Sequence, residues 1–169
     1  MVTRGLEDTA IPELYRHEVQ ELAQQLVRNA VAHGIESPAL REGMNKPGTG
    51  LVSIAWAQRR EGDFELTVED DGAGILLDAI RERLIANGMS AAEAVALGTS
   101  QLLGQLFKPG FSTRENIDED AGRGVGLDAV NEIVQRLGGR VRVHSRPGQL
   151  TRFHVLLPAV EPVSEYIAL

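Results

Sequence analysis

Residues 64–75 read FELTVEDDGAGI, and this stretch constrains the arrangement of the rest of the chain. Apolar and polar residues alternate from Phe64 to Asp70, which is the period-two pattern of a strand with one buried face. Asp70 falls on the apolar face, directly before a turn that Gly72 and Gly74 predict. Two interpretations are open: a tight turn with a solvated acid, or a pocket carboxylate that accepts a hydrogen bond from an amino group such as that of adenine.

Two hairpins are expected around this strand. Residues 51–57 are strand-like and are joined to the strand at 64–70 by a turn-prone segment, which favours an antiparallel pair. A second hairpin is expected near the C-terminus, at residues 140–145 and 151–157. Thr151 falls on the same face of its strand as the apolar residues that follow it, so a second polar group points to the apolar side of the sheet.

Helical signals occupy the remaining segments, apart from irregular structure expected at residues 35–50 and 108–120. This order of helices and hairpins favours an α+β fold, a two-layer α/β sandwich with helices on one face of a mainly antiparallel mixed sheet. Helices are predicted at residues 14–33 and 78–87, from a capping box at Ser90 and Glu93, from Thr99 or Ser100 to about residue 107, and from Gly126 to Gly138.

Composition describes an ordinary globular domain. The 169 residues are 43% hydrophobic and 24% charged, with a net charge of -7 and no cysteine. We expect one domain over residues 1–160 and a tail or linker at 161–169. The acidic balance opposes a nucleic-acid surface, and the lack of cysteine excludes disulfides and thiolate metal sites. No apolar run is long enough to cross a membrane, so a cytoplasmic protein without direct membrane contact is expected.

Polar side chains share the apolar stripe of the helix predicted at residues 14–33. Gln25, Asn29 and His33 lie one turn apart on the face that packs against the core. Asn29 is either a satisfied core amide or a hard oxygen ligand for Mg²⁺. His33 either binds a phosphate or caps the helix end. The four histidines lack compact ligand spacing, so no histidine metal cluster is expected.

Residues 122–126 read GRGVG and precede the last predicted helix. Glycines before a helix leave backbone N–H groups and the positive end of the helix dipole available to an anion. Their spacing matches neither the dinucleotide fingerprint nor the phosphate loop that ends in Gly-Lys-Ser or Gly-Lys-Thr. The acidic run at residues 115–120 suits a lid that orders over a nucleotide, or is a solvated face.

Four motifs, in this order, resemble the ATP-binding domain of histidine kinases, and their residues are most similar to those of chemotaxis-type (CheA-like) kinases. They are RNA at 28–30 with HGIE at 33–36, DDGAGI at 70–75, PGFST at 109–113 and GRGVGLD at 122–128. The resemblance covers nearly the whole chain, to Pro158. It implies the Bergerat nucleotide fold of the GHKL superfamily, with ATP and Mg²⁺ as cofactors.

The resemblance implies a role for each matching position. On the phosphate side, Asn29 would hold Mg²⁺, with Arg28 and His33 beside it as the catalytic set. On the base side, Asp70 would receive the adenine amino group and Thr151 would close the pocket floor. The remaining implied positions are Gly72, Gly74 and Ile75 along the base, Phe111, Ser112 and Thr113 beside the lid, and Gly122, Gly124 and Gly126 around the phosphates.

Three positions depart from the family pattern. Gln25 stands where hydrolysing relatives have a glutamate base and chemotaxis kinases usually a histidine, and an amide cannot take a proton at neutral pH. Ala32 stands where the kinases usually have an aspartate. Leu150 replaces the second glycine of the last glycine motif. These changes bear on catalysis more than on binding.

The function that the resemblance implies is binding of Mg-ATP and transfer of its γ-phosphoryl group to a histidine on a separate domain or protein, as in two-component, chemotaxis-type signalling. The implied partners are a phosphoacceptor histidine domain and a downstream response regulator, and the dimerisation region of such kinases is not expected in this chain. The three departures leave an alternative, a degenerate, non-catalytic nucleotide-binding regulatory or interaction module.

Overall fold

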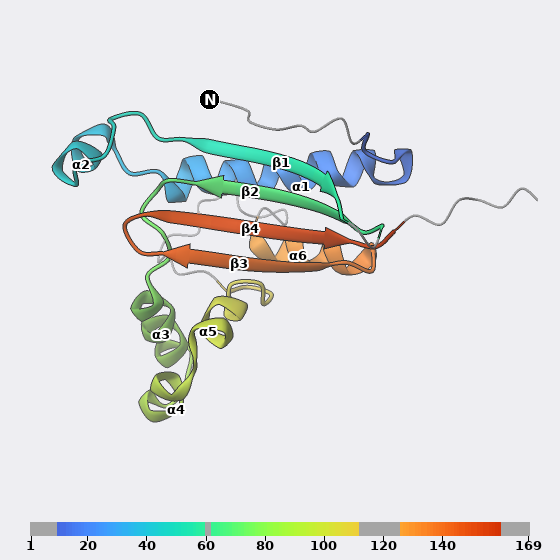
Figure 1. The fold of residues 1–169 in the computed structure, drawn as a ribbon. Coiled ribbons are helices and arrows are strands. Elements are labelled where there is room, and N and C mark those ends of the chain that lie inside the picture. Colours follow the sequence, from blue (N-terminus) through green and yellow to red (C-terminus); the bar gives the residue numbers. More distant parts are fainter. Residues whose placement is uncertain (1–9, 60–61, 112–125, 160–169) are drawn as a thin grey trace, which may run out of the picture.

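A computed structural model describes residues 10–59, 62–111 and 126–159 of the chain. These residues form a sheet with helices on one face, as Figure 1 shows. The strand order is β1-β2-β4-β3, and the three neighbouring pairs are all antiparallel. The α+β prediction is confirmed, although the described strands include no parallel pair. The strands are β1 (Val52–Gln58), β2 (Phe64–Asp70), β3 (Arg140–Arg146) and β4 (Leu150–Leu157).

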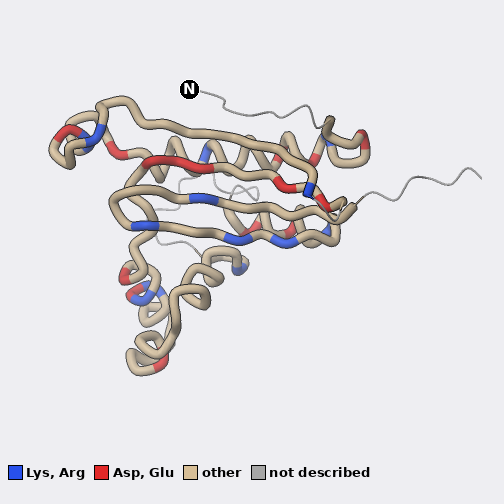
Figure 2. The backbone as a smooth tube through the Cα atoms, in the orientation of Figure 1, with Lys and Arg blue, Asp and Glu red and all other residues tan. Residues whose placement is uncertain are grey.

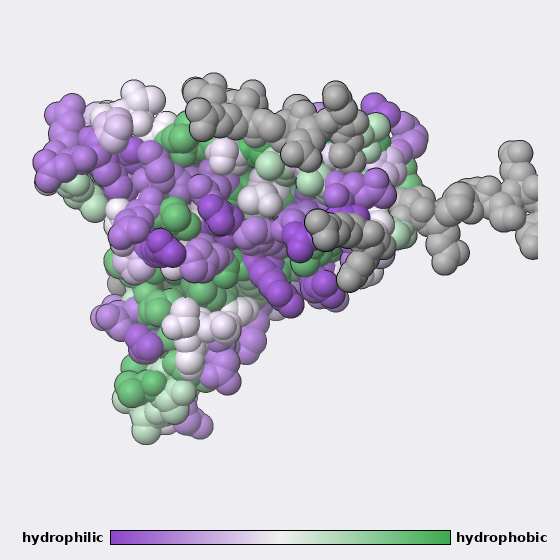
Figure 3. Space-filling model, in the orientation of Figure 1, coloured by the Kyte–Doolittle hydropathy of each residue, from purple (hydrophilic) through white to green (hydrophobic). Residues whose placement is uncertain are grey.

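Two helices cover the inner face of the sheet, α1 (Arg16–Asn29) behind β1 and β2, and α6 (Leu127–Arg136) behind β3 and β4 (Figure 1). The opposite face is largely hydrophilic (Figure 3). Within the described ranges, no helix is both long and apolar enough to cross a membrane. The other helical elements are η1 (Glu13–Tyr15), η2 (Ala30–Gly34), α2 (Pro38–Gly43), α3 (Leu77–Ala86), α4 (Ala91–Ala96) and α5 (Thr99–Gln105).

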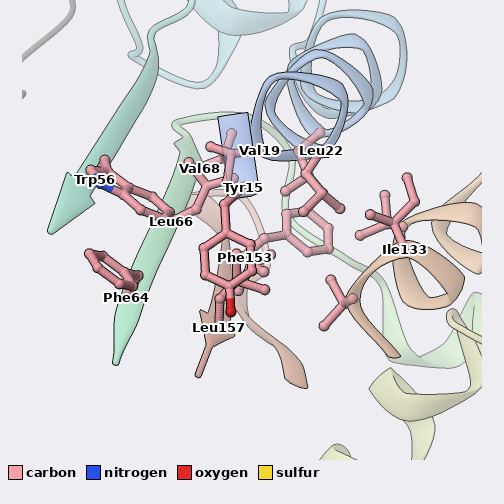
Figure 4. Packing of buried hydrophobic residues seen from close by; sticks show 14 of the residues in the cluster. Tyr15, Val19, Leu22, Trp56, Phe64, Leu66, Val68, Ile133, Phe153 and Leu157 are labelled. Carbon is pink, nitrogen blue, oxygen red and sulfur yellow. The ribbon is translucent and has the colours of Figure 1, made fainter. Parts of the chain in front are cut away.

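The main core lies between the inner face of the sheet and the two covering helices (Figure 4). Alternate residues of β2 and β4 are buried, as the period-two pattern predicts. Trp56 of β1 stacks on Phe64 of β2 with ring centroids 5.3 Å apart, and Tyr15 meets Phe64 edge-on at 6.2 Å. This packing fixes the central strands and so fixes the residues at their ends.

The structure differs from the sequence prediction in two segments. Residues 35–50, expected to be irregular, contain the short helix α2, which begins with Pro38 after Ser37. The single helix expected at residues 14–33 is divided into η1, α1 and the π-helical turn η2, which ends at Gly34. Elsewhere the predicted elements are found within a few residues, and the predicted capping box of Ser90 is present at the start of α4.

Candidate functional site

Asp70 and Thr151 form a buried polar pair at one end of the central strands. They are direct partners in the β2–β4 register, and their residues are only 4% and 5% exposed. Their strands place both on the inner face with the core, which confirms that part of the sequence prediction. A buried polar group needs a hydrogen-bond partner, so this end of the sheet is chemically distinct from the rest of the core.

The carboxylate of Asp70 has few hydrogen-bond partners among the described residues. Burial is the main reason why its pKa is raised to about 6, and the nearby carboxylates of Asp71, Glu36 and Glu69 also raise it. The hydrogen bond from the Gly72 N–H lowers the pKa and opposes these effects. That Gly72 N–H, at 3.0 Å from Asp70 Oδ1, is the one donor to this carboxylate among the described residues. At neutral pH the group therefore has unused acceptor capacity, which suits a ligand that donates a proton.

The turn after Asp70 brings backbone segments into direct contact. Ala73 N–H donates to the carbonyl of Gly34 at 2.8 Å, which ties the turn to the end of η2. A Cβ at Gly72 would lie 2.0 Å from that same carbonyl oxygen, and one at Gly74, where φ is +69°, would lie 2.5 Å from the carbonyl oxygen of Arg146. Glycine is required at both positions, because no side chain fits between these backbones.

Ile75 and Phe111 share an apolar environment beside the sheet. Both are half-buried and pack against the second apolar cluster, which Ile80, Leu84 and the α5 leucines form beside the sheet. Ile75 N–H also donates to Ser145 Oγ of β3 at 2.7 Å, so Ile75 stays attached to the sheet next to the Asp70 turn.

The described part of α1 carries two buried amide atoms without partners. Gln25 Oε1 and Asn29 Nδ2 are buried and make no hydrogen bond to any described residue. They belong to residues one turn apart on the same helix, and that helix continues through η2 to Gly34, where a Cβ would lie 3.0 Å from Asp70 Oδ1. Within the described ranges, therefore, the amide of Asn29 is not fully satisfied. A buried polar atom without a partner calls for an explanation, and a bound ligand or ion is one such explanation.

Arg28 and His33 are exposed on the same helical segment. Among the described residues, Arg28 makes no ion pair and the imidazole of His33 makes no hydrogen bond, so the helix-capping interpretation of His33 finds no support there. Gly126 is the residue before α6 and has an extended conformation. The predictions for Ser112, Thr113, Gly122 and Gly124 lie outside the described residues.

A cavity of about 540 Å³ lies away from this site, between the ends of α3 and α5 and the start of α4. Its lining includes Glu93, Lys108 and Phe111, but neither Asp70 nor Thr151. The cavity therefore contains one predicted position, Phe111, but not the buried polar pair that the motifs place at the adenine end.

Sequence reasoning missed a buried ionic cluster beside the Asp70 turn. The guanidinium of Arg41 in α2 is completely buried and pairs with Glu36 at 3.0 Å and with Asp71 at 2.8 Å. Lys46 pairs with the other oxygen of Glu36 at 2.7 Å. Figure 2 shows charged residues of both signs around α2, near the end of β2. A signal was present in the sequence, because an arginine and a lysine lie among glycines and prolines in a segment without helical period.

The sequence matches the family described as "Histidine kinase-, DNA gyrase B-, and HSP90-like ATPase" over residues 16–161. The chain belongs to this family. Membership confirms the resemblance that the four motifs indicate and agrees with the observed α+β fold. In that family setting, Asp70, Thr151 and the unpartnered amides lie in an ATPase domain of the kind that histidine kinases contain.

Proteins to which the chain is similar include two sequence relatives and one solved structure. Chemotaxis protein CheA of Halobacterium salinarum is 39% identical over 153 residues, which is 90% of this chain and 23% of that protein. The gliding motility regulatory protein of Myxococcus xanthus is 40% identical over 143 residues, 83% of this chain and 18% of that protein. The catalytic domain of histidine kinase ThkA aligns with a TM-score of 0.49 and 16% identity, over 85% of this chain and 66% of that one. The chain spans about a fifth of the length of these two named relatives.

The raised pKa of Asp70 makes a prediction about stability. A carboxyl with a folded pKa of about 6 binds its proton more tightly in the native state than its ordinary value of 3.8 allows in the unfolded chain. The native state therefore loses stability relative to the unfolded state as pH rises through this interval. Asp70→Asn removes this titration. The difference in free energy of unfolding, variant minus unaltered domain, should therefore become more positive by up to about 3 kcal/mol between pH 4 and pH 7.5.

Urea unfolding at both pH values measures this difference. Glu69→Gln is the comparison variant: Glu69 precedes Asp70 on the outer face, paired with Arg152, and its removal should lower the pKa of Asp70 only slightly and keep the pH-dependent difference. Parallel stability profiles for Asp70→Asn and the unaltered domain would show that Asp70 titrates in the ordinary range.

Proposed function

We propose that this domain binds Mg-ATP at the end of β2 and β4 and transfers the γ-phosphoryl group to a histidine on a separate domain or protein. The buried, nearly unpartnered carboxylate of Asp70 carries the proposal. Burial of a carboxylate without compensating donors is costly, so its retention calls for a function. The exocyclic amino group of adenine is a donor of the right kind for the acceptor capacity that Asp70 keeps.

The phosphate side of the proposed site is the α1 segment that ends near Asp70. An amide oxygen is a hard ligand that suits Mg²⁺, and Asn29 can offer its Oδ1, while its buried and unpartnered Nδ2 is a donor that suits a phosphate oxygen; the residue therefore fits an ion bound together with phosphates. Bound there, Mg²⁺ would neutralise charge on the nucleotide phosphates. Arg28 and His33 are exposed nearby on the same segment and are free to contact those phosphates.

Catalysis in this proposal depends on positioning and not on a covalent enzyme intermediate. Asp70 holds the base, the α1 side chains hold the phosphate end, and the imidazole nitrogen of the acceptor is itself the nucleophile. Gln25 has no basic group, so nothing at that position can take a proton from water. Transfer to a histidine is thereby favoured over hydrolysis. The transfer itself requires a phosphoacceptor histidine domain, and a response regulator is the downstream partner that the family resemblance implies.

One observation favours a second candidate function, a non-catalytic nucleotide-binding regulatory module. Gln25 Oε1 is buried with no partner in the described part of the chain, at the position where the family resemblance implies a base or a histidine. A domain with this change can keep its adenine end intact and lose turnover. Nucleotide binding without phosphotransfer would identify that case.

The first test of the proposal removes the adenine contact. Asp70→Ala should weaken ADP binding by about 10- to 100-fold, because the loss of a charge-assisted hydrogen bond costs about 1.5 to 3 kcal/mol. Isothermal titration calorimetry measures the affinity, and circular dichroism checks the fold. Glu69→Ala, which changes the neighbouring outward-facing carboxylate, should leave affinity unchanged. An unaltered ADP affinity in folded Asp70→Ala would remove Asp70 from the site.

The second test concerns magnesium. Asn29→Ala should lower ATP affinity about tenfold in the presence of Mg²⁺ and should have little effect in EDTA, because the variant removes an ion ligand and no base contact. Titrations of ATP in the two buffers give the comparison. Equal losses in both buffers would assign Asn29 to the core.

The third test separates kinase from hydrolase chemistry. The unaltered domain should hydrolyse ATP very slowly, and Gln25→Glu should raise hydrolysis by about 10-fold or more, since a general base typically contributes about 10²- to 10⁴-fold. Phosphate release and transfer of labelled phosphate to a separately supplied phosphoacceptor histidine domain are measured side by side. Gln25→Ala is the control, and fast hydrolysis that survives it would place the base elsewhere.

A further inference from the structure

The ammonium of Lys46 sits behind the Asp70 turn and contacts its backbone directly. Lys46 Nζ donates to the carbonyl oxygens of Asp71 at 2.9 Å and Gly72 at 2.8 Å, and to Glu36 Oε1 at 2.7 Å. An ammonium has three protons, so its donor capacity is fully used. The side chain is only 15% exposed, which keeps competing water away from these bonds.

Arg41 holds the segment that delivers Lys46. Its guanidinium donates to the carbonyl of Pro47 at 2.7 Å, next to Lys46 in the chain, and to Asp71 Oδ2 at 2.8 Å on the turn itself. Asp71 Oδ1 accepts in addition from the Leu51 N–H at 2.8 Å. The segment between Glu36 and Leu51 is therefore held against the Asp70 turn by several hydrogen bonds, which fix the position of Lys46.

Because the peptide bond is planar, the contacts of Lys46 with the carbonyl oxygens also fix the N–H groups on the other side of the same peptide units. No described peptide bond is cis, so the C=O and N–H of each unit point in opposite directions. In the Asp71–Gly72 unit, the oxygen faces Lys46 and the N–H donates to Asp70 Oδ1 at 3.0 Å. In the Gly72–Ala73 unit, the oxygen again faces Lys46 and the N–H donates to the carbonyl of Gly34 at 2.8 Å.

We infer that Lys46 is a positioning residue that orients the Asp70 carboxylate for recognition of the 6-amino group of a purine. By holding the Asp71 and Gly72 carbonyls, Lys46 keeps the Gly72 N–H on Asp70 Oδ1 and leaves Asp70 Oδ2 to the ligand. This inference rests on the proposed adenine-binding role of Asp70 and adds a determinant of base specificity that touches no ligand. A cation that only compensated the charge of Glu36 would not need contacts with two backbone carbonyls.

The inference is tested by base discrimination. Calorimetry compares ADP with inosine diphosphate, which has the same phosphates and sugar but lacks the 6-amino group. Lys46→Met should lower ADP affinity about tenfold and change inosine diphosphate affinity less than about twofold, since only ADP uses the oriented carboxylate. Equal weakening of both nucleotides, or no change in either, would overturn the positioning role.

Two further variants separate positioning from general stability. Glu36→Gln removes the ionic partner of Lys46 but leaves both carbonyl contacts, so it should lower thermal stability and keep the preference for ADP. In an Asp70→Ala background, Lys46→Met should change ADP affinity less than about twofold, because a residue that acts through Asp70 adds nothing once Asp70 is gone. Additive losses would contradict the inference. If Lys46→Met does not fold, Lys46→Gln provides the same comparison.

Failure of the inference and failure of the proposed function give different results. An unaltered domain that binds ADP no better than inosine diphosphate would overturn the role of Asp70, and the inference with it. An unaltered domain that prefers ADP, with a Lys46→Met variant that keeps the full preference, would overturn the inference alone.

Discussion

The pairing of Asp70 with Thr151 across β2 and β4 is the constraint on which the rest of the site depends. In a sheet with period-two side chains, a slip of one residue in either strand would turn the polar group of that strand outward and would expose its apolar residues. The packed core thus fixes the register, and the register places a carboxylate and a hydroxyl under the ends of α1 and η2. Core packing and site geometry are set by the same pairing.

A buried carboxylate in that position is unfavourable on its own, and the neighbouring segment fixes the turn that carries it without compensating its charge. Arg41 and Lys46 bring two cations to the cluster that Glu36, Asp70 and Asp71 form. Neither cation contacts the Asp70 carboxylate; both bind the turn behind it. Asp70 is therefore placed accurately by the protein, and its pKa is raised by burial first and by the neighbouring carboxylates second.

The alternation of apolar and polar residues predicted the strands and the faces on which their residues lie. Alternation gave β2 with its observed bounds, Phe64–Asp70, and placed Asp70 and Thr151 on the inner face. The ionic cluster was missed because Arg41 and Asp71 are distant in the sequence. The β1–β2 hairpin lies between them, and they come together only when it has formed. A short helix such as α2 has no period long enough to detect, and tertiary contacts stabilise it more than propensity does. Membership in the ATPase family was predictable because four short motifs occur in the right order.

The two ends of the proposed site differ in how completely the described residues build them. At the adenine end, the turn after Asp70 is fixed by hydrogen bonds to Gly34, Lys46 and the β3–β4 turn. At the phosphate end, buried amide atoms of Gln25 and Asn29 lack partners in the described ranges, and Arg28 and His33 are exposed. A rigid base site selects the nucleotide before any chemistry occurs, because its geometry costs no reorganisation on binding. A phosphate site whose polar atoms are unsatisfied gains its hydrogen bonds from the ligand itself, so its order is coupled to occupancy. Such a division would allow base selection and the proposed phosphoryl transfer to change independently.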